Sequence, residues 1–83
     1  MAIVIHPHAF QRMEERGANK EEILKTIKMG RTSPARSGRR RYGMTVSYKD
    51  HWQGQFYGHK HIEVLCADEG EDIIVITVVV KYF

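Results

Sequence analysis

The sequence predicts one α+β domain over residues 1–83, in which an N-terminal two-helix hairpin packs on one face of a three- to four-stranded, mainly antiparallel sheet. Eighty-three residues are enough for one small core and too few for two domains. Apolar residues recur at helical spacing in the first third, whereas the second half is rich in isoleucine and valine, which favour strands. A hydrophobic fraction of 42% with 28% charged residues is typical of a folded globular chain.

Two helices are expected before residue 31. The first covers residues 8–16 and ends at Gly17, a residue type that suits a left-handed helix cap. The second begins after Asn19, with Glu22 as its capping-box partner, and ends at Gly30. The short connection between them predicts a helical hairpin.

Strands with alternating or continuous apolar residues are expected after the helices, over residues 41–49, 61–67 and 72–82. Polar turns are expected to separate them at residues 50–54 and 68–71, and the short segment 55–58 fits either a strand or a wide loop. The segment 3–5 leaves an additional edge strand open. The last strand is apolar on both faces, which predicts an interior strand and is also compatible with a homodimer.

The charge of the chain is concentrated in its middle third. The net charge is +3, and the stretch from residue 31 to residue 49 has no acidic residue but six basic ones: Arg31, Arg36, Arg39, Arg40, Arg41 and Lys49. Such a stretch favours a polyanionic partner such as RNA, with Arg39, Arg40, Arg41 and Lys49 as candidate contacts. A solvated loop with no partner is an equally simple interpretation.

The sequence also predicts in which cellular compartment the protein is found. Residues 1–8 have no basic region followed by a long apolar stretch, so no signal or transit peptide is expected. The longest apolar run, residues 73–80, is much shorter than the roughly 20 residues of a membrane span. With Cys66 as the one cysteine, no internal disulfide can form, and we expect a cytoplasmic protein with no membrane contact.

The first candidate site is a stripe on the first helix. His8, Arg12 and Arg16 are spaced four residues apart and project from one helix face. The two guanidinium groups can hold a phosphate in a fork while the imidazole exchanges a proton. The alternative is structural, because four nearby glutamates can pair with these arginines: Glu14, Glu15, Glu21 and Glu22.

The second candidate site follows from strand alternation. If the apolar side chains face the helices, one open sheet face carries the polar residues Arg41, Thr45, Ser47, Lys49, His61, Glu63, Thr77 and Lys81. RNA can be cut without a metal when a base removes the 2′-hydroxyl proton, an acid protonates the leaving oxygen and cations stabilise the phosphorus centre. His61 and Glu63 with Arg41 and Lys81 supply those groups. The alternative is an ordinary polar outer face, and a one-residue shift of register would turn the whole set around.

Other kinds of chemistry have less support. The histidine pairs His6/His8 and His59/His61 have metal-like spacing, but no cysteine cluster accompanies them, and we expect neither a metal nor a cofactor. Cys66 lies in an expected strand, where a buried thiol is unreactive. Phe56 is expected in the core, while Trp52 suits either the core or base stacking.

The helix signature His8-Ala9-x-x-Arg12-Met13-x-x-Arg16-Gly17 resembles that of a small bacterial family of unknown function. The segments Arg40–Tyr42 and Val75–Val78 resemble that family's first and closing strands, so the resemblance extends over nearly the whole chain. The family is grouped by fold with RelE-like toxins, in the barnase, EndoU, colicin and RelE class of metal-independent ribonucleases. By matching positions, the resemblance singles out His8, Arg12, Arg16 and Thr77. The long middle segment 50–61 departs from the family pattern.

The resemblance implies a RelE-like domain that cleaves RNA and, as a toxin, is held inactive by a protein antitoxin. Our first interpretation is therefore an RNA-binding domain with metal-independent endoribonuclease activity that uses the helix stripe and the open face together. Its candidate catalytic residues are His8, Arg12, Arg16, His61 and Glu63, and its candidate RNA contacts are Arg39, Arg40, Arg41, Lys49, Thr77 and Lys81. The alternative is a non-catalytic domain that binds nucleic acid or an acidic protein through the same basic surface, and the sequence leaves enzyme activity open.

Overall fold

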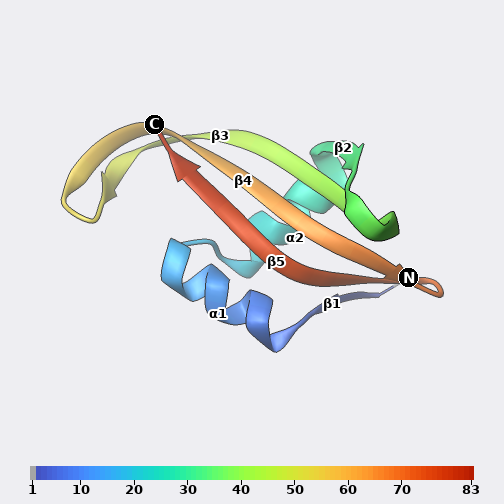
Figure 1. The fold of residues 1–83 in the computed structure, drawn as a ribbon. Coiled ribbons are helices and arrows are strands. Elements are labelled where there is room, and N and C mark those ends of the chain that lie inside the picture. The colour runs from blue at the N-terminus through green and yellow to red at the C-terminus, as the bar shows by residue number, and fades with distance from the viewer. Residues whose placement is uncertain (1) are drawn as a thin grey trace.

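The structure is a computed structural model that describes residues 2–83, and it consists of two helices on one face of a five-stranded mixed sheet (Figure 1). In chain order the elements are β1 (Ile3–Ile5), α1 (Pro7–Arg16), α2 (Lys20–Met29), β2 (Arg31–Pro34), the 3₁₀ turn η1 (Arg36–Gly38), β3 (Arg40–Trp52), β4 (Gln55–Glu69) and β5 (Asp72–Tyr82). The strand order is β1-β5-β4-β3-β2. Only β1 and β5 run parallel, and every other neighbouring pair is antiparallel.

Both helices begin and end where the sequence predicts. The His6 side chain caps α1, and Gly17 ends it with a left-handed φ of 76°. At the start of α2 the Asn19 side chain accepts from the Glu22 backbone N–H at 2.8 Å, and the Glu22 carboxylate accepts from the Asn19 N–H at 3.0 Å. This capping box is confirmed, and Gly30 follows the last turn of α2.

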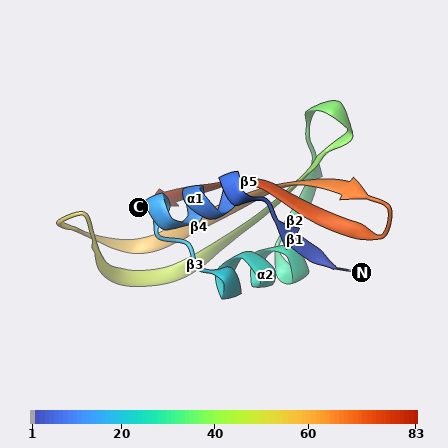
Figure 2. The same cartoon turned by 90° about the horizontal axis from the view of Figure 1, so that it is seen from below.

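The two helices cover the same sheet face, which encloses the core (Figure 2). Buried side chains of α1 and α2, among them Ala9, Met13 and Ile23, pack against Ile62 and Val64 of β4. The predicted inward face of this strand is confirmed. Within residues 2–83, no helix lies over the opposite sheet face (Figure 1).

The predicted number of strands was too low. The three expected strands are present as parts of β3, β4 and β5, and the helices pack on a sheet with two further edge strands, β1 and β2. The β2 sequence, Arg-Thr-Ser-Pro between Gly30 and Ala35, has no apolar alternation because it is a short edge strand. The β1 strand pairs with β5 seventy residues away, and local sequence carries no signal for such a pairing.

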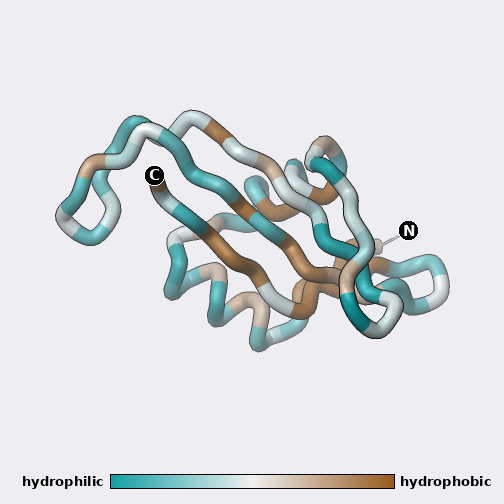
Figure 3. Tube along the Cα trace, turned by 45° about the horizontal axis from the view of Figure 1, so that its top comes forward, coloured by the Kyte–Doolittle hydropathy of each residue, from teal (hydrophilic) through white to brown (hydrophobic). Residues whose placement is uncertain are grey.

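The predicted turn at residues 50–54 is shorter than expected, because residues 50–52 belong to β3. Strands β3 and β4 continue to a two-residue turn at Gln53 and Gly54, whose φ values are 49° and 82°, as a type I′ hairpin turn requires. A bulge between Ser47 and Asp50 lets the strand bend within the polar stretch. The resulting hairpin extends beyond the helices, and its tip is hydrophilic (Figures 1 and 3).

Aromatic packing fixes this hairpin to the rest of the molecule. The Trp52 ring stacks on the Tyr82 ring, with 5.0 Å between centroids and 16° between planes, so Trp52 packs within the protein. Phe56 was expected in the core, but it is 56% exposed because the strands continue past the end of the helix layer. The Lys60 side chain is buried beneath this cluster, where its Nζ donates to the Gly17 carbonyl at 2.6 Å and to Glu22 Oε1 at 3.0 Å.

No helix within residues 2–83 has the length and apolar character that crossing a membrane requires.

Candidate functional site

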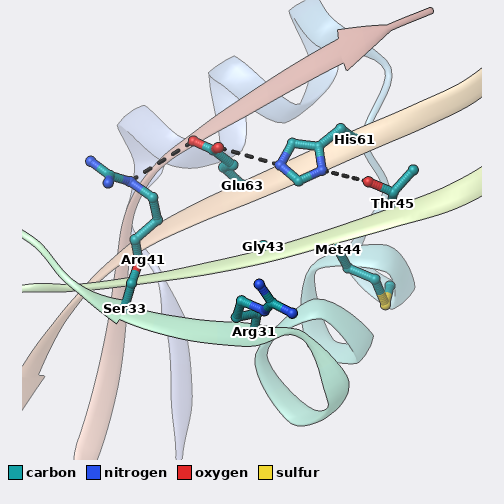
Figure 4. Close-up of a pocket in the computed structure, with 8 residues that line it drawn as sticks. All are labelled: Arg31, Ser33, Arg41, Gly43, Met44, Thr45, His61 and Glu63. Atoms are coloured by element: carbon teal, nitrogen blue, oxygen red, sulfur yellow. Dashed lines mark hydrogen bonds and ion pairs between the residues drawn. The ribbon is translucent and has the colours of Figure 1, made fainter.

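Four polar side chains form a continuous line across the open sheet face (Figure 4). Thr45 Oγ1 lies 2.8 Å from His61 Nδ1, and His61 Nε2 lies 3.3 Å from Glu63 Oε1. The second carboxylate oxygen of Glu63 lies 3.8 Å from Arg41 Nε. The structure therefore brings together Arg41, His61 and Glu63, three residues that strand alternation placed on one face.

Strand register explains this arrangement. Thr45 pairs with His61 across β3 and β4, and Gly43 pairs with Glu63. Alternation turns the intervening residues of β4, such as Ile62, into the core. The side chains of Thr45, His61 and Glu63 are thus held on the solvent side by the same pairing that fills the core.

Gly43 creates the space in front of this line. A Cβ atom at this position would lie 3.5 Å from His61 Cε1 and 3.9 Å from Glu63 Cγ. With no side chain there, the face is hollowed by about 460 Å³ between β2 and β4. Such a volume is in the range of small-ligand sites.

Strand β2 completes the hollow with Arg31 and Ser33, two residues that sequence reasoning did not assign to the site. Arg31 pairs with Gly43 in the register of β2 and β3, so its side chain flanks the space that the glycine leaves. Arg31 makes no ion pair with any other residue of the described chain. The signal that could have found both residues is their spacing of two, which places Arg31 and Ser33 on one face if the segment is a strand.

The hydrogen bonds of His61 determine where its proton lies. The Glu63 carboxylate only accepts hydrogen bonds, so His61 Nε2 carries the hydrogen in both the neutral and the charged ring. In the neutral ring, Nδ1 therefore accepts a hydrogen bond from the Thr45 hydroxyl. In the charged ring, Nδ1 donates a hydrogen bond to the Thr45 hydroxyl oxygen. The site thus holds a proton donor and a proton acceptor side by side.

These two groups are accessible to a ligand. The side chains of His61 and Glu63 are 28% and 31% exposed, and Arg41 is 48% exposed. Guanidinium groups of Arg31 and Arg41 border the hollow, where they can hold an anionic group in a fork. The arrangement can therefore bind a phosphate and exchange protons with groups beside it.

The predicted helix stripe lies elsewhere. Arg12 Nη1 pairs with Glu15 at 2.9 Å, and Arg16 Nη1 donates to the Val78 carbonyl of β5. His8 is exposed at the start of α1. Because α1 packs on the core face, the structure does not bring His8, Arg12 and Arg16 together with His61 and Glu63. The expectation that both sets form one site is not supported by this placement.

The remaining candidate contacts are distributed around the hollow. Thr77 lines a smaller hollow of about 110 Å³ beside Arg41 and Glu63, and Lys81 pairs with His61 across β4 and β5. Lys49 is exposed at the β3 bulge. Two further arginines lie near β2: Arg39, which is exposed, and Arg40, which pairs with Asp68 at 3.2 Å.

The positions of the possible metal ligands and of Cys66 bear on metal and thiol chemistry. Within the part of the chain that the structure describes, no three His, Cys, Asp or Glu side chains are grouped closely enough to hold a metal ion. Cys66 is buried as predicted, and burial, together with nearby Asp68, raises the pKa of its thiol to about 11. Its thiol therefore stays protonated at neutral pH and does not act as a nucleophile.

Comparison with known proteins identifies the family. A family model described as a domain of unknown function (DUF4258) matches residues 5–80. The chain belongs to this family. Membership of DUF4258 confirms the prediction of a small family of unknown function, and its match covers both helices and the line of polar residues from Arg41 to Glu63. No curated protein and no solved structure matches the chain.

Proposed function

We propose that the open sheet face binds RNA and cleaves its backbone without a metal ion. The observation that carries the proposal is the His61–Glu63 pair, a proton donor and acceptor 3.3 Å apart, in a hollow bordered by Arg31 and Arg41. A phosphodiester with a neighbouring hydroxyl needs these groups, because its cleavage removes a proton from the attacking 2′-hydroxyl, adds a proton to the leaving 5′-oxygen and increases the charge on the phosphate between them.

The proposed reaction is an internal transesterification. The Glu63 carboxylate accepts the 2′-hydroxyl proton as the 2′-oxygen bonds to phosphorus. The bond from phosphorus to the 5′-oxygen breaks, and the His61 imidazolium, released from its hydrogen bond to Glu63 when the RNA binds between the two side chains, donates its Nε2 proton to that leaving oxygen. The products are a 2′,3′-cyclic phosphate and a 5′-hydroxyl. Arg31 and Arg41 stabilise the charge on the non-bridging oxygens during this step.

Thr45 is a positioning residue in this scheme. Its hydroxyl bonds to Nδ1 at 2.8 Å, which fixes the orientation of the imidazole and keeps Nε2 beside the Glu63 carboxylate. The surrounding basic residues, Lys49, Lys81 and the arginines near β2, supply the sequence-independent attraction to the RNA backbone.

The RelE-like grouping belongs to this proposal as well. Two helices followed by an antiparallel run of strands support it, since this is the layout that the resemblance implies. The same grouping suggests a cytoplasmic toxin with a protein antitoxin as partner. An antitoxin that covers the open face would block the hollow directly.

The test is cleavage of labelled RNA by the purified protein in excess chelator, with the ends of the products mapped. We expect 2′,3′-cyclic or 3′-phosphate ends. Glu63→Gln and His61→Ala should each reduce the rate on the order of 100-fold or more, with little change in RNA affinity, because each removes one proton-transfer group. Glu71→Gln in the exposed β4–β5 turn and His51→Asn in the exposed hairpin are matched controls.

His8→Ala separates this proposal from the helix-stripe interpretation. If His8→Ala removes cleavage while His61→Ala retains it, the open face is not the active site. RNA that is bound in a salt-dependent manner but stays intact would contradict the nuclease proposal and favour a non-catalytic binding domain.

A further inference from the structure

We propose that the stacked rings of His59 and Phe83 form a platform that binds one unpaired base of a single-stranded nucleic acid on the open face. Their centroids are 5.2 Å apart, and the ring planes differ by 20°. Phe83 is 61% exposed, although it is among the most apolar side chains of the protein. The inference deepens the proposed function, since the base would belong to the strand whose phosphate lies at His61.

The platform lies on the same face as the hollow. His59 is two residues from His61 in β4, and the residue between them, Lys60, is 4% exposed on the helix side. Alternation therefore turns His59 to the open face, where it pairs with Ser47 of β3. The spacing of two strand residues, about 6 to 7 Å, places the platform next to the proton-transfer pair.

The backbone holds the platform in place. The His59 N–H donates to the Phe83 carbonyl at 2.8 Å, and the Phe83 N–H donates to the His59 carbonyl at 3.0 Å. This closed pair fixes both residues at adjacent positions without burying either ring. The stacking of each ring on the other restricts their side-chain rotation, so less conformational freedom is lost when a base stacks on them.

The surroundings favour a nucleic acid as the occupant. The core is complete without Phe83, which is absent from the buried cluster and from the residues packed against it. Lys81, two residues before Phe83, is exposed on the same face, and Arg31 and Arg41 border the adjacent hollow. An aromatic surface beside cations matches the alternation of bases and phosphates in a single strand.

The probe is a fluorescently labelled 2′-deoxyoligonucleotide, which has no 2′-hydroxyl and so cannot be cut by the proposed reaction. We expect Phe83→Ala to weaken its binding about 5- to 100-fold, which is the usual effect of losing one base–aromatic stack. Phe83→Leu should weaken binding similarly, because it keeps an apolar side chain but not the ring face. Phe83→Trp should retain binding, and a duplex of the same sequence should bind equally to all variants, because its bases are already stacked.

Phe56→Ala is the matched control, because Phe56 is 56% exposed and meets His51 edge-on at 74°. Equal losses for the Phe56 and Phe83 variants, or equal binding by Phe83→Ala and the unchanged protein, would overturn the platform. If RNA is cleaved but Phe83→Ala binds normally, only the platform is wrong. If the oligonucleotide binds in a Phe83-dependent manner but RNA stays intact, only the cleavage proposal is wrong. Absence of any binding would contradict both.

Discussion

Gly43 and His61 illustrate what single residues contribute to the open face. Gly43 leaves the hollow because any side chain there would meet the imidazole edge at 3.5 Å. His61 is held from both sides, by Thr45 and by Glu63. Alternation along two clear strands was sufficient to place His61, Glu63 and Thr45 on one face. The alternation did not reveal the hollow, because a glycine such as Gly43 adds neither an apolar nor a polar side chain to the strand pattern.

Tyr82 provides a prediction about alkaline pH. Burial, and then nearby Tyr48 and Glu22, raise the pKa of Tyr82 from 10.0 to about 12, and its hydroxyl donates to the Arg16 carbonyl at 2.8 Å. The unfolded chain loses this proton near pH 10, whereas the folded chain keeps it to about pH 12. The stabilising contribution is therefore complete below pH 10 and is lost as the pH rises from 10 to 12.

Urea unfolding at a series of pH values checks this expectation. The free energy of unfolding should fall between pH 10 and 12, and Tyr82→Phe should show a smaller fall because it has no phenol to ionise. Cys66 has its own raised pKa of about 11, so part of the fall remains in that variant. An identical pH profile for both proteins would contradict the role given to Tyr82.

At the scale of elements, prediction succeeded where the signals were local. The predicted caps at Asn19 and Gly17 are local hydrogen-bond and backbone features, and both helices end where the sequence indicates. The edge strand left open at residues 3–5 is β1, which depends on a distant partner, β5. The strand that was missed, β2, pairs with its sequence neighbour β3 but has no apolar alternation. The continuation of the β3–β4 hairpin through Asp50 depends on Trp52 stacking on Tyr82, a contact that no local pattern shows.

The contact between the helix connection and this hairpin gives a second prediction. A Cβ atom at Gly17 would lie 2.6 Å from Trp52 Cζ3 and 2.7 Å from the Tyr82 hydroxyl oxygen, and Gly17 has a φ of +76°. Gly17→Ala should therefore lower the free energy of unfolding for two reasons, backbone conformation and overpacking. The overpacking part is expected to cost about 1 to 3 kcal/mol.

Gly70→Ala separates the two effects, since Gly70 also has a positive φ, +63°, but no atom within 4 Å of its Cβ position. Chemical denaturation of both variants should show the larger loss for Gly17→Ala, with a change in tryptophan fluorescence in that variant alone. Equal losses would mean that Trp52 moves aside without cost and that the hairpin is not fixed at this contact.

For the whole molecule, the sheet separates two kinds of surface. One face holds the helices and the core (Figure 2), and the other carries the polar line and the hollow (Figure 4). The His59 and Phe83 rings lie on that second face as well. The net charge of +3 is small, but the cations Arg31, Arg41 and Lys81 lie on the open side. Because of this separation, we expect that removing a positive charge from the open face weakens nucleic-acid binding more than removing one from the helix face.

Salt dependence tests this prediction without reference to cleavage. The logarithm of the affinity for a single-stranded oligonucleotide should fall linearly with the logarithm of the salt concentration. Each lost phosphate contact should make the slope of this line less steep by about 0.7. Arg31→Gln should do so, because Arg31 flanks the hollow and has no ion pair within residues 2–83. Lys25→Gln on the exposed side of α2 removes the same charge from the helix layer and should leave the slope unchanged. Equal slopes for the two variants would show that net charge alone attracts the strand, and that the open face is not where its phosphates bind.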